Sequence, residues 1–206
     1  DAMIERPLLQ MALRDVADKT FNCITVDGDT STNDMVIAMA NGLAGNDRIR
    51  ELGEDYARFA GALEYVCTDL AKKIARDGEG ATKLIAVTVR GARRPQDAKT
   101  VAMSIAQSEL VKTAVFGADA NWGRIMCAAG YSGVDFDPSR VDILIGPLNV
   151  ADGGMDAGFC EERAREILSA DEAEITVDLK NGFEKMTVWT CDLTFDYVKI
   201  NASYRS

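Results

Sequence analysis

The chain contains no histidine, few prolines and no surplus of positive charge. Without histidine, its own residues cannot form a Ser-His-Asp triad, a Cys-His pair or a histidine-based zinc site. Its 23 basic and 33 acidic side chains give a formal net charge of −10. Binding to nucleic acid or to an anionic membrane needs a basic surface, so we expect neither as a partner.

Long apolar runs and paired cysteines are also missing. No stretch approaches the roughly 18 consecutive apolar residues that a membrane-spanning helix needs, and no basic-then-apolar leader opens the chain. The cysteines are odd in number and show no CxxC spacing, so we expect small, buried, reduced side chains and no disulfide or metal site. They are Cys23, Cys67, Cys127, Cys160 and Cys191. These absences predict a soluble, cytoplasmic protein.

The residues that are present indicate a folded chain. Hydrophobic residues make up 47% of the 206 positions and charged residues 27%, which is typical of one ordinary domain or two small ones. Apolar spacing of three and four predicts helices, and β-branched or alternating runs predict strands. The expected helices are 4–18, a short buried one at 35–40, 47–76, 95–107, 121–129 and 161–168. The expected strands are 20–26, 84–89, 141–145 and 172–180.

Two of these elements carry further predictions. The helix at 47–76 has an apolar stripe along its length, which must face either a core or a partner; the sequence does not decide between them. Asn181-Gly182 after the strand at 172–180 is a strong signal for a two-residue hairpin. The returning strand changes phase between Val188 and Trp189, which suggests a bulge or burial of both faces. Helices and strands alternate without a regular βαβ period, so the class is α/β or α+β.

Generic motifs define no complete catalytic set. The glycine-rich run 153–158 lacks the Lys-Ser/Thr of a phosphate-binding loop. Glu79 lies between two glycines just before a buried strand, where it could bind an amine, relay a proton or simply be a solvated turn residue. The polar run 30–34 could line a site or cap a helix. The segment 121–124 could be a binding surface, or a packed Trp122 beside a capping asparagine.

Four longer motifs are more specific. They are Thr-Val-Asp-Gly-Asp-Thr-Ser-Thr-Asn-Asp at 25–34, Asp-Gly-Glu-Gly-Ala-Thr-Lys at 77–83, Phe-Gly-Ala-Asp-Ala-Asn-Trp-Gly-Arg at 116–124, and Asp-Tyr-Val-Lys-Ile-Asn-Ala-Ser-Tyr-Arg-Ser at 196–206. Together they resemble the ornithine acetyltransferase family, the bifunctional enzymes of arginine biosynthesis, from end to end of the chain. The resemblance implies a four-layer α-β-β-α sandwich with α/β composition.

The resemblance also implies an activity. Family members cut themselves before a threonine, and residues 1–206 resemble the resulting β chain, which shares its active site with a separate α chain. The new N-terminal threonine takes the acetyl group of N-acetylornithine, and glutamate then collects it in a ping-pong exchange. Some members also accept acetyl-CoA. The implied assembly is an α2β2 heterotetramer without a cofactor.

Three residues match substrate-contacting positions of the family: Glu79, Asn201 and Ser206, the last commonly a threonine in relatives. No catalytic residue is expected within the chain itself, because the nucleophilic threonine is expected just upstream of Asp1. Two alternatives remain open. One is a non-catalytic small-molecule-binding or structural subunit, and the other is a related acyltransferase or amidase of specialised metabolism.

Overall fold

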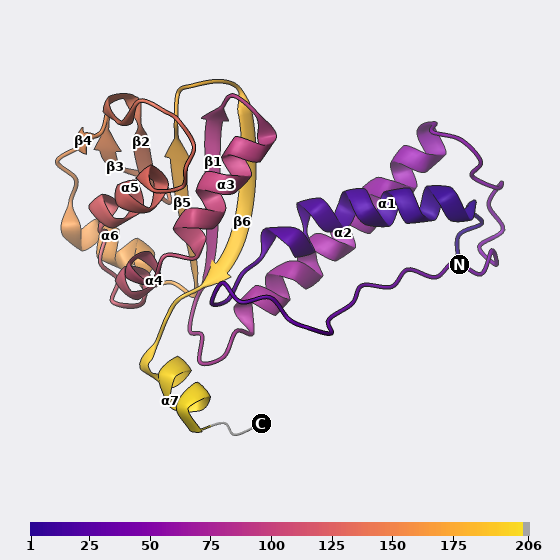
Figure 1. Cartoon of the computed structure of the whole chain (residues 1–206), viewed down its shortest axis with the longest axis horizontal. Coiled ribbons are helices and arrows are strands. Elements are labelled where there is room, and N and C mark those ends of the chain that lie inside the picture. Colours follow the sequence, from indigo (N-terminus) through magenta and orange to yellow (C-terminus); the bar gives the residue numbers. More distant parts are fainter. Residues whose placement is uncertain (204–206) are drawn as a thin grey trace. The chain divides into compact units, whose positions relative to one another are not determined.

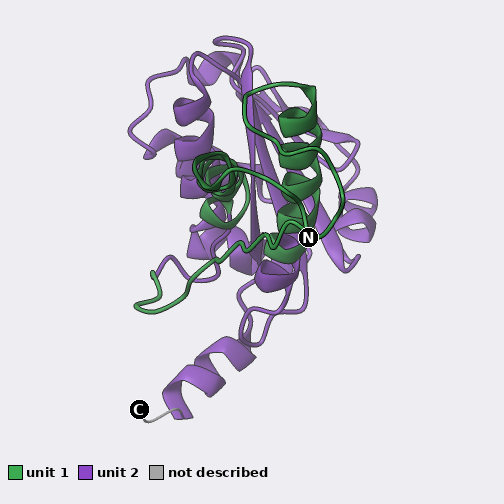
Figure 2. Ribbon diagram, turned by 90° about the vertical axis from the view of Figure 1, so that its right-hand side faces the viewer, with its two compact units in different colours: residues 1–23, 30–71 green, residues 24–29, 72–206 purple. Residues whose placement is uncertain are grey.

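A computed structural model describes residues 1–203, which form two compact units. Unit 1 contains residues 1–23 and 30–71, and unit 2 contains residues 24–29 and the chain from 72 onward (Figure 2). Each unit is considered by itself. None of the helices among the described residues combines the length and the apolar character needed to cross a membrane.

Unit 2 is built on one six-stranded mixed sheet with the order β4-β3-β2-β5-β1-β6 (Figure 1). Strand β1 runs parallel to β5 on one side and antiparallel to β6 on the other. The strands are β1 Leu84–Ala92, β2 Asp142–Ile145, β3 Leu148–Asp152, β4 Met155–Asp156, β5 Glu172–Asp178 and β6 Glu184–Cys191. The mixed α/β class is therefore confirmed. The described residues form one β-sheet.

Helices cover this sheet. Helix α3, Pro95–Ala106, packs against β1 and β6, and α6, Glu161–Leu168, packs against β2 and β5. Apolar residues recur at helical spacing in α3, and their side chains are buried, as that pattern predicts. The remaining helices of this unit are α4 Glu109–Phe116, α5 Trp122–Gly130, the 3-10 turn η2 Pro138–Arg140 and α7 Phe195–Ser203. The sequence pattern did not predict α4, α7, β3 or β4.

The predicted hairpin at Asn181-Gly182 is wrong. Strands β5 and β6 are not neighbours, because β1 lies between them. The connecting segment continues to pair with β1 past the end of β5: Leu179 N donates to Arg90 O and Asn181 N donates to Gly91 O. Gly182 then lies so close to Ala92 that a side chain would collide with the Ala92 carbonyl. The Asn-Gly pair instead lies in the segment that crosses over the end of β1 to connect β5 with β6.

Of the two explanations predicted for the phase change between Val188 and Trp189, a bulge is excluded and burial of both faces is confirmed. Pairing between β1 and β6 is continuous there, and the register shifts instead between Val89 and Ala92. The phase change reflects burial of both faces, since the consecutive residues Thr190 and Cys191 are both buried. Cys127 and Cys160 differ from expectation as well, because they are exposed, whereas Cys23, Cys67 and Cys191 are buried.

Unit 1 contains α1, Arg6–Lys19, and most of α2, Glu54–Arg76. Helix α1 agrees with the prediction, whereas α2 begins seven residues later than the apolar stripe suggests. The strand at 20–26 is wrong: a 3-10 turn, η1 Phe21–Cys23, occupies it, and the Thr20 hydroxyl donates back to Val16 O. Such local side-chain bonding favours a helix end over an extended strand.

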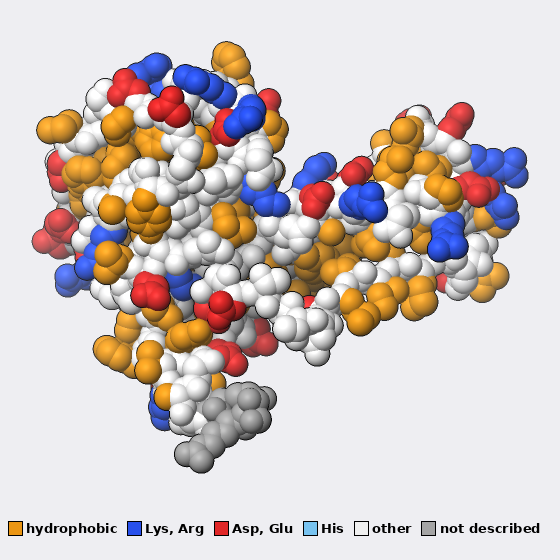
Figure 3. Space-filling model, in the orientation of Figure 1, with side chains coloured by type: hydrophobic (Ala, Val, Ile, Leu, Met, Phe, Trp, Pro, Cys, Tyr) orange, Lys and Arg blue, Asp and Glu red, His pale blue; other side chains and the backbone are white. Residues whose placement is uncertain are grey.

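The short buried helix predicted at 35–40 is wrong too. This segment has no regular structure, and its large apolar side chains are exposed, with Met39 at 89%. Figure 3 shows hydrophobic side chains gathered along one face of unit 1. Val66 and Leu70, two members of the predicted stripe on α2, are exposed as well. Contiguous exposed apolar surface of this kind is typical of an interaction site.

The Lys83 ammonium joins three parts of unit 2. It precedes β1 and donates to Val115 O at 2.9 Å, to Phe116 O at 3.5 Å and to Leu168 O at 2.7 Å. These carbonyls lie at the C-terminal ends of α4 and α6, where a cation is favoured by the helix dipoles. Burial lowers the pKa of Lys83, and the carboxylate of Asp192 opposes that shift.

Replacing Lys83 tests whether this ammonium supports the fold. We expect Lys83→Met to lower the free energy of unfolding by about 2 kcal/mol or more, because buried carbonyls lose their donor. Urea denaturation of the purified protein measures it. Lys185→Met, the same change at an exposed position of β6, is the matched control. Equal stability of the two variants would contradict the prediction.

Candidate functional site

The Gly-Glu-Gly segment forms a tight turn between α2 and β1. Ala81 N donates to Gly78 O at 2.9 Å, and Gly80 has a positive φ of +69°, as the third position of a type II turn requires. Close packing explains the other glycine: a Cβ at Gly78 would lie 2.8 Å from Cys191 Sγ. The turn therefore holds Glu79 at its tip, where its side chain is exposed.

Asn201 reaches Glu79 from the C-terminal helix α7. Its amide nitrogen donates to Glu79 Oε2 at 2.6 Å and to Tyr197 O at 3.0 Å. The structure thus brings together two of the three predicted site residues, which are 122 positions apart in the sequence. Ser206, the third, lies outside the described residues.

The bonding of this pair fixes what it can recognise. Both amide protons of Asn201 are used by protein acceptors, so towards any further group the side chain can offer only its Oδ1, as an acceptor. Within the described residues, neither Asn201 Oδ1 nor Glu79 Oε1 accepts a hydrogen bond. The pair therefore offers acceptors and a negative charge, a combination that suits a donor-only group such as an ammonium.

Sequence reasoning missed two residues beside this pair. The Tyr197 hydroxyl donates to Asp27 Oδ2 at 3.0 Å, which ties α7 to the Thr-Val-Asp-Gly-Asp motif. Burial, the hydrogen bond to Asp27 and the charges of Asp27, Asp29 and Glu79 raise the pKa of Tyr197 to about 12. Both residues lie within motifs that carry the family resemblance, and that was the available signal.

A buried lysine connects the same motif to β6. The Lys112 ammonium, 2% exposed, donates to Val26 O at 2.5 Å and to Thr190 Oγ1 at 2.9 Å, with Cys191 Sγ at 3.7 Å. Burial lowers the pKa of Lys112 and raises that of the Cys191 thiol. Cys191 Sγ also lies against Gly78. The contacts of Lys112 with Val26, Thr190 and Cys191 therefore help to hold the residues on which the Glu79 turn packs.

The other two polar clusters of the sequence analysis differ in their local structure. Residues 30–34 belong to unit 1, form no helix, and contain local bonds such as Asn33 N to Ser31 Oγ, so the helix-capping interpretation is wrong. Asn121 does cap a helix, because its Oδ1 accepts from Arg124 N at 3.2 Å at the start of α5. Trp122 is half-buried and donates to Asp156 Oδ2 at 3.2 Å.

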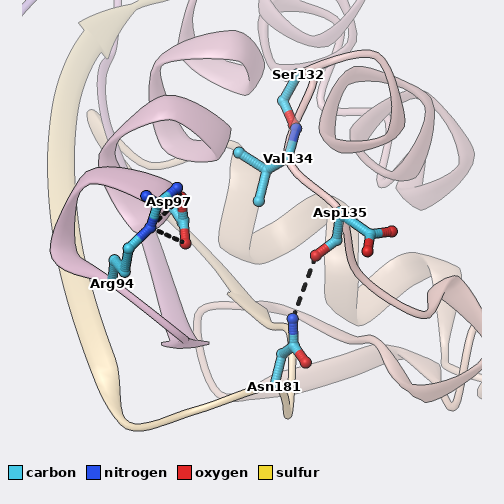
Figure 4. Close-up of polar contacts among 6 residues, drawn as sticks. All are labelled: Arg94, Asp97, Ser132, Val134, Asp135 and Asn181. Atoms are coloured by element: carbon cyan, nitrogen blue, oxygen red, sulfur yellow. Dashed lines mark hydrogen bonds and ion pairs between the residues drawn. The ribbon is translucent and has the colours of Figure 1, made fainter.

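Trp122 also lines an open groove of about 580 Å³, which lies between α5 and the loop after it. Figure 4 shows how this loop is held: Asn181 Nδ2 donates to Asp135 O at 3.2 Å. Arg94 and Asp97 form a separate ion pair at the start of α3. The groove contains neither Glu79 nor Asn201. Its lining includes Trp122, Met126, Cys127, Val134, Phe136 and Pro138.

Comparison with known proteins decides the family. The sequence matches the ArgJ family over residues 1–206. The chain belongs to the ArgJ family. A relative named arginine biosynthesis bifunctional protein ArgJ, from Geobacillus stearothermophilus, is 54% identical over 206 residues, which are 100% of this chain and 50% of the relative. The protein of the same name from Staphylococcus epidermidis is 53% identical over 204 residues, 99% of this chain and 51% of the relative.

A solved ArgJ structure confirms the fold. The crystal structure of arginine biosynthesis bifunctional protein argJ from Bacillus halodurans matches with a TM-score of 0.96 and 54% identity. The match covers 99% of this chain and 96% of that chain. The present chain spans about half the length of the curated ArgJ relatives, so it is comparable to a half-length chain of that structure.

The Tyr197–Asp27 bond gives a pH-dependent prediction. Tyr197 ionises near its ordinary pKa of 10.0 in the unfolded state and near 12 in the folded state, so the folded state keeps the proton to a higher pH. Its contribution to stability is full below the unfolded pKa and is lost as pH rises through the folded pKa. Phenolate absorbance should show a tyrosine that titrates near pH 12 and is missing in Tyr197→Phe, whereas the raised pKa of Tyr56 should persist in that variant. In Asp27→Asn its pKa should fall toward the ordinary value, and an unchanged pKa would contradict the assigned bond.

Proposed function

We propose that this chain is one half of an acetyltransferase of arginine biosynthesis, which moves the acetyl group of N-acetylornithine to glutamate. The observation that carries the proposal is the hydrogen-bonded Glu79–Asn201 pair. It presents a carboxylate oxygen and an amide oxygen, and no outward donor of its own. The side-chain ammonium of N-acetylornithine has only donors and one positive charge, so it complements both oxygens.

The proposed chemistry uses a threonine nucleophile supplied from outside residues 1–206. Its hydroxyl attacks the acetyl carbonyl of N-acetylornithine, the amide C–N bond breaks, and the departing amine of ornithine takes up the proton. The acetyl group remains on the threonine as an ester. The neutral amine of glutamate then attacks that ester, forms N-acetylglutamate and restores the hydroxyl. Glu79 and Asn201 hold the first substrate by its ammonium while its amide is attacked.

Two observations support a partner chain from the same precursor. This chain covers about half of the curated ArgJ proteins but 96% of one solved ArgJ chain, as a protein divided into two chains would give. Exposed apolar side chains at Met35, Ile37 and Met39 offer a surface for such a partner. The proposal therefore includes an α chain and an α2β2 assembly. Acetyl-CoA as a second donor fits the word bifunctional in the relatives' names.

Intact-mass spectrometry tests the acyl-enzyme directly. The full protein that contains this chain should give two chains on denaturation, one of which begins with threonine. Incubation with N-acetylornithine should add one acetyl group to the threonine chain. A protein that stays a single chain and gains no acetyl group would instead support the non-catalytic alternative. Acetylation by a different amide, but not by N-acetylornithine, would support an acyltransferase of another pathway.

Glu79→Gln tests the ammonium assignment with little change in shape. The glutamine carbonyl can still accept the Asn201 hydrogen bond, so the variant removes charge and keeps the contact. We expect the KM for N-acetylornithine to rise roughly 10- to 100-fold, the value of one charge-assisted hydrogen bond. Glu184→Gln, which neutralises an exposed carboxylate at the first residue of β6, is the control. An unchanged KM in Glu79→Gln would refute the assignment.

A further inference from the structure

One hydroxyl group connects the two elements that carry Glu79 and Asn201. Thr194 Oγ1 donates to Gly80 O at 2.7 Å. The same oxygen accepts from Asp196 N at 3.2 Å and from Tyr197 N at 3.4 Å. Thr194 is only 6% exposed, so water does not readily replace these bonds.

Each of these bonds has a structural consequence. The amides of Asp196 and Tyr197 lie in the first turn of α7 and lack helical acceptors, so Thr194 acts as the N-cap of that helix. The Gly80 carbonyl belongs to the turn whose tip is Glu79. A single side chain therefore begins the helix of Asn201 and binds it to the turn of Glu79.

The contact between helix and turn is close as well as hydrogen-bonded. A Cβ added at Gly80 would lie 2.6 Å from Tyr197 N and 2.8 Å from the carbonyl carbon of Asp196. The start of α7 thus packs directly on the backbone of the turn. Asn201 lies four residues after Tyr197, about one helical turn, and hydrogen-bonds to its carbonyl. Displacing the helix start would carry the Asn201 amide away from Glu79.

Asp192 holds the residues that follow the turn. Its carboxylate accepts from Thr82 N at 2.8 Å, Thr82 Oγ1 at 2.5 Å and Lys83 N at 2.9 Å. Thr194 follows Asp192 by two residues, so its backbone begins at a residue that these three hydrogen bonds hold in place. Because the turn is already anchored there, loss of the Thr194 hydroxyl would move α7 more than it moves Glu79.

We propose that Thr194 is a positioning residue, which sets the geometry of the Glu79–Asn201 pair through the Gly80 carbonyl. It touches no substrate and acts through the two residues that do. This inference rests on the proposed function, because the pair is the part assigned to the ammonium of N-acetylornithine.

Three variants of the full protein separate the possible roles. Thr194→Val keeps the shape of the side chain but removes both the N-cap acceptor and the hydrogen bond to Gly80 O, which we call the tether. Thr194→Ser keeps the hydroxyl. Thr194→Asp keeps an N-cap acceptor but has no proton to donate to Gly80 O. The matched control is Thr113→Val, because Thr113 is an exposed threonine of α4 whose hydroxyl bonds only within its own helix.

The readouts are the KM and kcat for N-acetylornithine and the hydrogen exchange of the α7 amides. We expect the KM to rise about tenfold in Thr194→Val, the value of one lost hydrogen bond, with a smaller change in kcat. Thr194→Ser should restore the KM. Thr194→Asp should keep slow exchange in α7 yet show a raised KM, even though its added charge favours binding of a cation. Thr113→Val should match the parent.

Two results would overturn the inference. One is faster exchange or lower stability in Thr194→Val with an unchanged KM, which would mean a purely structural cap. The other is a Thr194→Asp variant with the parent's KM, which would mean that the tether to Gly80 is dispensable. If the parent protein itself fails to use N-acetylornithine, the proposed function fails. Exchange of the α7 amides still tests the cap in that case.

Discussion

The candidate site depends on one buried carboxylate. Asp192 is 3% exposed, and its two oxygens accept hydrogen bonds from Thr82 and Lys83 at the point where the chain enters β1. The residue immediately follows β6, so this bonding holds the beginning of β1 against the end of β6. An unpaired buried carboxylate would cost several kcal/mol, so three donors make its position strongly preferred. The Gly-Glu-Gly turn and α7 both extend from this junction.

Two buried ammonium groups complete the framework. Lys83 donates hydrogen bonds to carbonyls at the C-terminal ends of α4 and α6, and Lys112 donates to Val26 O and Thr190 Oγ1. Burial disfavours both charges, as their lowered pKa values indicate, and the surrounding oxygens offset part of that cost. Removing either ammonium would leave buried oxygens without their donor, so the arrangement strongly favours one geometry. It brings the segments near residues 26, 83 and 190 together, and Val26 and Cys191 lie against Gly78 in the turn that carries Glu79.

Those parts of the fold that depend on the pattern of neighbouring residues could be predicted from the sequence. Helices α1, α3, α5 and α6 follow from apolar spacing, and β1 follows from burial on both faces. The hairpin at Asn181-Gly182 failed because turn chemistry does not reveal that β1 will be inserted between β5 and β6. Glu79 was one of several polar candidates in the sequence itself, and the family resemblance singled it out, whereas Asn201 came from the resemblance alone. Thr194, Tyr197 and Asp27 escaped prediction because their roles arise from contacts across more than a hundred residues.

The errors in unit 1 have a different physical origin. A run such as Met35-Val36-Ile37 predicts burial, because large apolar side chains leave water wherever a core is available. In the described residues these side chains are exposed and the segment is irregular. The proposed partner chain would account for this exposure, since exposed apolar surface of this kind is typical of an interaction site. An apolar pattern predicts burial but does not say in which chain the covering residues lie. The same reasoning applies to Glu79 and Asn201, which offer acceptor oxygens but no nucleophile, so the proposed reaction needs residues from outside this chain.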